Sequence, residues 1–413
     1  MKFTSFFKSL FRRALFFLAI LGPGLITASA DNDASGIATY SLVGSHYGYR
    51  MLWIILVVTI GEVVVAEMGA RMGAVTGKGT SDLIRENFGV RVTLFAMICL
   101  LIANLGTTIG QFAGIAAGAE LFGISRYIAV PLVAALLIAV VIIGSYFTVE
   151  KFLLALSLFS LSYIASAIMG KPDWGLVVRD ALIPTFDASP MFLLVVMATV
   201  GTTITPWGIC YIQSSVADKG VGLKDYKFTR LDVVIGSAWG NVVSAFIIIA
   251  TAATLYTHGI RVDSAEQAAL ALEPLVGTGA RTLFAAGLLG ASVLAGSVLP
   301  LATAYSLCEA FGWERGLDKK YREAPIYFGI FIGAVVISSL IILIPGLPLF
   351  PVMWLSQTLN AFFLPVLLIL VLKLVNNKRL MGRMVNTKAQ NVLGVLLTIA
   401  ISAITLMLFV LSV

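Results

Sequence analysis

Apolar runs of about 20 residues, each long enough for an α-helix to cross the hydrocarbon core of a bilayer, follow one another along almost the whole chain. Only 12% of the 413 residues are charged, which is about half the fraction found in a soluble domain. A soluble multi-domain enzyme is therefore excluded. We expect a single all-α polytopic membrane domain over residues 1–413, because backbone polar groups inside a bilayer must be satisfied within each segment.

Hydropathy along the chain predicts eleven membrane spans. They lie near residues 14–43, 51–70, 94–119, 127–147, 152–169, 191–217, 232–256, 281–308, 326–345, 350–375 and 391–412.

The distribution of basic residues predicts the orientation. With the N-terminus in the cytoplasm, 22 of the 28 Lys and Arg residues fall on the cytoplasmic side of these spans. We therefore expect an integral, multi-pass protein of a prokaryotic plasma membrane, with its C-terminus outside. The net charge of +7 is scattered over short loops, which argues against a nucleic-acid partner.

Two of the predicted spans are interrupted. Gly22-Pro23-Gly24 and residues 31–36 break the first span, and residues 201–208 break the sixth. Breaks five spans apart are typical of an inverted five-plus-five repeat with a substrate site at the bilayer midplane. The first repeat would cover about 14–170 and the second about 190–376, followed by an extra helix at about 391–412. The alternative is that these Gly and Pro residues only kink their helices.

Two aspartates lie beside the first break, where an acidic side chain is costly to insert. Where the chain unwinds, Asp31 and Asp33 can converge with freed carbonyl oxygens into an oxygen-lined cation site. One of the two could instead cap the half-helix that follows from Gly36.

The sixth span adds hydroxyl groups at its break. Thr202, Thr203 and Thr205 precede Pro206, which frees a backbone carbonyl one turn earlier. Any one of these threonines could simply bond back to its own helix. Ligand sets made only of oxygen favour hard ions such as Mg²⁺, Ca²⁺ or Mn²⁺.

The other charged residues of the spans are less informative. Glu67 and Arg71 have the spacing of an ion pair on one helix, whereas Glu62 has no such partner and is a second-tier candidate for the site. His46 and His258 are expected in external loops, so neither is placed to relay protons at the midplane. Nucleotide-binding and hydrolase motifs are absent, so we expect neither an enzyme nor an ATP-driven pump.

The sequence resembles the NRAMP divalent-metal transporters over nearly its whole length. Landmarks of that family occur in order: Leu21-Gly22-Pro23-Gly24, Ile37-Ala38-Thr39, residues 70–78, Lys171-Pro172-Asp173-Trp174, Ser356-Gln357 and residues 376–382. The resemblance implies the LeuT-type fold, alternating access and a metal between spans 1 and 6. It implies a transported divalent cation and a lipid bilayer as partners, with no cofactor.

The binding motifs depart from the family's pattern. Asp33 matches the family's aspartate, but Gly36 stands where the family has an asparagine ligand, and Asp31 is an added acid. Thr205 replaces the methionine that coordinates transition metals in the family. The acidic pair of span 3 falls near Thr107 and Gly110, beside Gln111, and this loss puts proton coupling in doubt.

This combination is similar to the NRAMP-related magnesium transporters. The expected site residues are Asp33, Asp31, Gly36, Thr202, Thr205 and Gln357, with Glu62, Thr203 and Gln111 in a second tier. Mg²⁺ keeps several waters, and smaller side chains at two family ligand positions would leave room for them.

The leading hypothesis is a facilitative transporter that prefers Mg²⁺ and tolerates Mn²⁺. The alternatives are a proton-coupled Mn²⁺/Fe²⁺ symporter, a sodium-coupled organic-solute transporter on the same fold, and a channel.

Overall fold

The computed structural model describes residues 32–143, 158–316 and 319–412, and all regular elements in these ranges are helical. The α-helices are α3 (Ala34–Tyr47), α4 (Leu52–Thr76), α5 (Thr80–Leu121), α6 (Arg126–Ile143), α8 (Ser162–Met169), α9 (Trp174–Leu182), α10 (Pro190–Thr203), α11 (Pro206–Asp218), α12 (Tyr226–Thr254), α13 (Ala265–Ala269), α14 (Glu273–Val276), α15 (Ala280–Phe311), α16 (Pro325–Ile342), α17 (Leu349–Val375), α18 (Lys378–Met381) and α19 (Lys388–Ser412). The 3-10 turns are η1 (Leu158–Leu161), η2 (Tyr256–His258), η3 (Leu270–Leu272) and η4 (Gly277–Gly279).

Long apolar helices confirm most of the predicted spans. Within the described ranges, nine helical segments are long and apolar enough to cross a membrane. They correspond to the predicted spans 2, 3, 4, 6, 7, 8, 9, 10 and 11. The first part of span 1, with Gly22-Pro23-Gly24 and Asp31, and the first part of span 5 lie outside the described residues.

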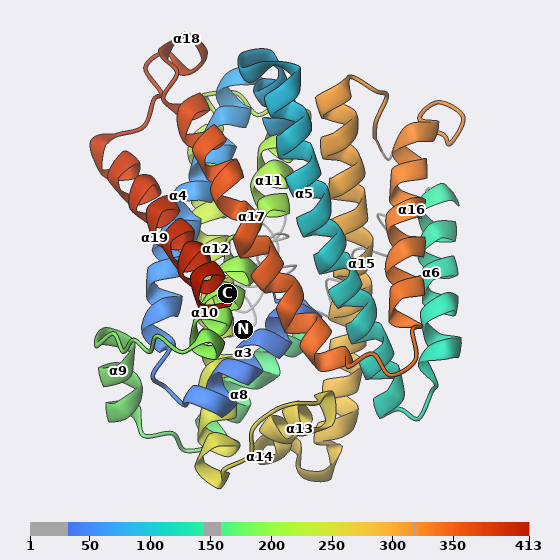
Figure 1. The fold of residues 1–413 in the computed structure, drawn as a ribbon, viewed down its shortest axis with the longest axis vertical. Coiled ribbons are helices and arrows are strands. Elements are labelled where there is room, and N and C mark those ends of the chain that lie inside the picture. Colours follow the sequence, from blue (N-terminus) through green and yellow to red (C-terminus); the bar gives the residue numbers. More distant parts are fainter. Residues whose placement is uncertain (1–31, 144–157, 317–318, 413) are drawn as a thin grey trace, which may run out of the picture.

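The helices form one bundle around α5 (Figure 1). The most extensive helix packing joins α5 to α15 and to α17, while α12 packs against α3 and α4. The short helices α13 and α14 lie at the end of the bundle opposite α18. The start of α3, the end of α10 and the start of α11 are all buried inside this bundle.

Two local expectations were wrong. The helix of span 3 begins at Thr80 rather than near residue 94, and it bends at Gly89, where the backbone leaves helical geometry. His46 lies in the last turn of α3 instead of in a loop, because α3 continues to Tyr47. His258 ends η2, in a connection as predicted.

Candidate metal site

The N-terminus of α3 is organised by Asp33. The helix starts at Ala34, and Asp33 is its N-cap, with Oδ1 accepting the backbone N–H of Gly36 at 2.7 Å. The capping role considered for the aspartates therefore belongs to Asp33. Its side chain is buried, and its oxygens keep lone pairs beyond those used by the cap.

Gln111 of α5 holds this helix start from the other side. Its Nε2 donates to Oδ2 of Asp33 at 2.6 Å and to Oγ of Ser35 at 3.2 Å. Its Oε1 accepts the backbone N–H of Ala34 at 3.3 Å. An uncharged amide thus fixes the carboxylate and satisfies one free N–H of the helix terminus.

The break in the sixth span lies where it was predicted. Helix α10 ends at Thr203 and α11 begins at Pro206, with Ile204 and Thr205 in non-helical conformations between them. Thr205 is the N-cap of α11, and its Oγ accepts the backbone N–H of Gly208 at 3.2 Å. Proline suits the first helical position, since its missing N–H would have no partner there.

The two other threonines of the break differ in their contacts. Thr203 donates to the carbonyl of Thr199 at 2.8 Å, and its hydroxyl lies 3.0 Å from the Tyr40 hydroxyl of α3. The hydroxyl of Thr202 is buried, and it has no hydrogen-bond partner among the described residues. A buried polar atom without a partner costs free energy, so Thr202 is the threonine most in need of a ligand or water.

Gln357 of α17 faces the end of α10. Its Oε1 accepts from Nδ2 of Asn360 at 2.8 Å, and the same Asn360 nitrogen lies 3.3 Å from the carbonyl of Gly201. A Cβ atom at Gly201 would overlap the Gln357 carbonyl, so glycine is needed for this approach. Thr107 of α5 donates to Oδ1 of Asn360 at 3.0 Å, which links α17 to the helix that carries Gln111.

Glu62 of α4 lies beside the break between α10 and α11. It lines a cavity of about 20 Å³ with Thr203 and Thr205, which is room for about one water molecule. Its Oε2 accepts from Nδ2 of Asn241 of α12 at 2.5 Å. Asn32, just before α3, also contacts α12, donating to the carbonyl of Gly240 at 3.1 Å.

The remaining predicted residues have the following places. Gly36 lies inside the first turn of α3 rather than in the break, so its backbone belongs to the helix. Asp31 lies outside the described residues. Within those residues, no group of three or more His, Cys, Asp or Glu side chains could hold a metal, so a site here would combine Asp33 with amide, hydroxyl and carbonyl oxygens.

The predicted ion pair of Glu67 and Arg71 is confirmed, because Oε2 of Glu67 lies 3.2 Å from the Arg71 guanidinium. Both side chains are buried, and Arg71 also donates to the carbonyls of Met384 and Val385 at 2.9 and 3.1 Å. The pair therefore anchors the segment that leads into α19. This supports the structural interpretation of these charges.

Sequence reasoning missed the asparagines that support the site. Asn360 lies one helical turn after Gln357, and Asn241 lies in a separate helix. An i, i+3 spacing from Gln357 was the one available signal for Asn360, and nothing in the sequence links Asn241 to Glu62.

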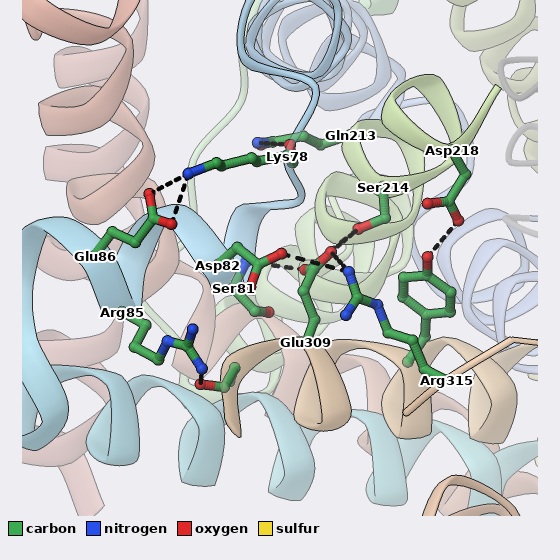
Figure 2. Close-up of polar contacts among 12 residues, drawn as sticks. Lys78, Ser81, Asp82, Arg85, Glu86, Gln213, Ser214, Asp218, Glu309 and Arg315 are labelled. Carbon is green, nitrogen blue, oxygen red and sulfur yellow. Dashed lines mark hydrogen bonds and ion pairs between the residues drawn. The ribbon is translucent and has the colours of Figure 1, made fainter. Parts of the chain in front are cut away.

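A second polar cluster joins residues of α5, α11 and α15 (Figure 2). The Glu309 carboxylate of α15 is buried and accepts the backbone N–H of Ser81 at 3.2 Å and the Ser214 hydroxyl of α11 at 3.2 Å. Arg315 lies 3.5 Å from Oε1 of Glu309. A side chain at Gly79, the N-cap of α5, would overlap this carboxylate, which explains the glycine.

Arg315 extends the cluster to two further acids. Its guanidinium lies 3.4 Å from Oδ2 of Asp82 and 5.0 Å from the ring centre of Tyr305, whose hydroxyl donates to Asp218 (Figure 2). Burial alone would lower the pKa of Arg315, but its contact with Tyr305 and the charges of Glu309 and Asp82 raise it. The cluster thus joins α5, α11 and α15.

The Nramp family, described as natural resistance-associated macrophage protein-like, matches residues 24–411 of this chain. The chain belongs to the Nramp family. It is 27% identical over 395 residues to the divalent metal cation transporter MntH of Yersinia pestis (strain Pestoides F), covering 93% of each chain. It is 28% identical over 412 residues to MntH of Bacillus subtilis (strain 168), covering 95% of this chain and 92% of that one.

Among solved structures, this Nramp chain is similar to the Eremococcus coleocola manganese transporter in complex with an aromatic bis-isothiourea substituted compound. The TM-score is 0.77 at 23% identity, over 94% of this chain and 85% of that one. The likeness confirms the predicted LeuT-type helical fold.

Proposed function

We propose that this Nramp chain is a facilitative transporter of divalent metal cations that prefers Mg²⁺, tolerates Mn²⁺ and works by alternating access without proton coupling. Its relatives from Yersinia pestis and Bacillus subtilis are named divalent metal cation transporters, which supports the substrate class. The chain's own residues support the choice among divalent ions.

The observation that carries the proposal is the set of donors at the helix breaks. Asp33 is a buried carboxylate at the start of α3. Thr202 is a buried hydroxyl at the end of α10 that has no hydrogen-bond partner in the part of the chain that the structure describes. Gln357 approaches the same end of α10 through Asn360. Each of these side chains offers oxygen and none offers sulfur, which favours a hard cation.

One carboxylate with neutral oxygens also suits Mg²⁺ on energetic grounds. Mg²⁺ gives up its waters reluctantly and is commonly bound through one or two carboxylates while several waters remain. The water-sized cavity beside Glu62, Thr203 and Thr205 would hold solvent next to the break. Asp31 would add a second charge near the ion.

The absence of proton coupling is proposed from the partners of Asp33. The Asp33 carboxylate accepts a hydrogen bond from the side-chain amide of Gln111. This amide neither gains nor loses a proton near neutral pH. Glu62, the other acid beside the break, is bound to the amide of Asn241.

The proposal is tested by uptake into liposomes of purified protein that contain a magnesium indicator or a pH indicator. We expect saturable Mg²⁺ uptake that Mn²⁺ inhibits competitively, with no acidification of the lumen. A proton-coupled Mn²⁺ symporter, which is the alternative function, would acidify the lumen when Mn²⁺ is added. Transport of Mn²⁺ without transport of Mg²⁺ would overturn the proposed selectivity.

A further inference from the structure

A groove of about 870 Å³ lies between α17 and α19, away from the candidate metal site. It is lined by Ile369, Leu372, Lys373, Asn376, Val395, Thr398, Ile399, Ser402, Ala403 and Leu406. All but a few of these side chains are apolar or small, and the polar pair Lys373 and Asn376 lies at one end of α17. The groove therefore has an apolar length and a basic end.

The dimensions of the groove match one leaflet of a bilayer. Its lining on α19 runs from Val395 to Leu406, which is about 16 Å of helix at 1.5 Å per residue. Half of the hydrocarbon core is about 15 Å. Among the nine long helices of the described residues, α19 is the least buried, so most of its surface is available to lipid.

The basic end of the groove is rich in cationic side chains. The segment 373–388 contains Lys373, Lys378, Arg379, Arg383 and Lys388 and has no acidic residue. No ion pair involves any of these five side chains within the described part of the chain. Lys373 is exposed beside the groove, where a long side chain can keep its charge at the membrane interface.

Side-chain hydrogen bonds tie α17 to α19 at the basic end of the groove. The side-chain amides of Asn376 and Asn391 are paired in both directions, at 2.7 and 2.9 Å. Deeper in, a Cβ atom at Gly394 would lie 2.7 Å from Cδ2 of Leu372, so the two helices meet closely there. The groove is therefore bounded by two helices tied to each other at its basic end.

We propose that this groove binds an anionic glycerophospholipid, with an acyl chain along α19 and the headgroup phosphate at Lys373. The bias of basic residues predicts that this end faces the cytoplasm, where anionic lipids attract juxtamembrane lysines and arginines. A second copy of the chain is a poorer occupant, because both copies would carry their cations at the same depth. The lipid site is independent of the ion that the protein transports.

The test compares phosphatidylglycerol with phosphatidylcholine of the same acyl chains, added to the delipidated full-length protein in detergent. Native mass spectrometry counts bound lipids, and thermal unfolding reports their effect on stability. We expect phosphatidylglycerol to bind more tightly and to raise the Tm further. Lys373→Gln should weaken phosphatidylglycerol binding about five-fold, since one juxtamembrane lysine changes the affinity for an anionic lipid by about that factor. The binding of phosphatidylcholine should not change.

Two further variants separate charge from shape. Lys320→Gln removes a positive charge in the α15–α16 loop, outside the groove. The binding of both lipids should therefore match that of the parent protein. Ala403→Phe, or Ser402→Leu if the first variant fails to fold, fills the groove and should reduce binding of both lipids. Equal binding of the two lipids, or parent-like binding by Lys373→Gln, would overturn the proposal. So would efficient disulfide dimers of Ser402→Cys in vesicles, because they would assign the face to a second copy.

Discussion

Nε2 of Gln111 lies 2.6 Å from Oδ2 of Asp33, while the same side chain accepts the Ala34 backbone N–H. Through these two contacts, a neutral residue of α5 sets the position of the carboxylate at the start of α3. This arrangement keeps Asp33 oriented in the absence of a bound ion. Loss of Gln111 would therefore free the carboxylate and leave the Ala34 N–H without this acceptor, with no change in charge.

Asp33→Asn should abolish uptake and preserve the fold. Asparagine is as good an N-cap as aspartate, so the contact with Gly36 can persist while the negative charge is removed. Asp33→Ala is the harsher comparison, since it loses the cap as well, at a cost of about 0.5–2 kcal/mol. Uptake in liposomes and the Tm are measured for both variants. Transport retained by folded Asp33→Asn would show that this carboxylate does not bind the ion.

Gln111→Glu should make uptake depend on pH. The introduced carboxylate would lie next to Asp33, and two close carboxylates share a proton more readily than they ionise together. Uptake should then change with pH across the neutral range, whereas the parent should vary little. Gln111→Met is the matched control, because it removes the donor without adding a titratable group. Equal pH profiles for parent and Gln111→Glu would disprove the role given to this amide.

Thr205→Met combined with Gly36→Asn should shift the preference from Mg²⁺ toward Cd²⁺ and Mn²⁺. A thioether is a soft ligand that contributes little to Mg²⁺ binding, and the added volume displaces waters that Mg²⁺ retains. Because Thr205 caps α11 and Gly36 lies in the first turn of α3, the Tm and the size-exclusion profile are checked first. Competition of Cd²⁺ with Mg²⁺ uptake gives the selectivity. An unchanged ratio in a folded variant would place selectivity at other residues, with Glu62 and Gln357 next.

Arg315→Ala should loosen the polar cluster that joins α5, α11 and α15. Removal of the cation leaves the buried Glu309 carboxylate with hydrogen bonds but without its ion-pair partner. Cys308 and Cys210 are buried in α15 and α11, so their modification by a maleimide reports separation of these helices. We expect several-fold faster modification in membranes that expose this end of the protein.

Lys319→Ala is the matched control for Arg315→Ala. This variant breaks the ion pair of Lys319 with Glu314, in which both side chains are exposed. Exposed ion pairs contribute about 0–1 kcal/mol to the free energy of unfolding. Thiol modification should therefore match the parent. If Arg315→Ala and Lys319→Ala react at the same rate, the buried cluster does not hold the helices together.

The all-helical membrane fold, the break before Pro206 and the pair of Glu67 with Arg71 could all be predicted from the sequence. These features depend on neighbouring residues along one chain segment: an apolar run of bilayer length, a proline without an N–H, and charges one helical turn apart. The candidate residues Asp33 and Thr202 could be named from the sequence for the same reason, since a polar side chain inside an apolar run stands out locally.

The distant side chains that support that site could be identified only from the packing of the helices. Gln111 follows Asp33 by 78 residues, Asn241 follows Glu62 by 179, and Glu309 follows Ser81 by 228. Each of these polar groups is buried between packed helices, where it must find a hydrogen-bond partner, and helix packing rather than sequence spacing determines which partner is within reach. The groove of α17 and α19 has the same origin, because its two walls become neighbours only when the helices cross.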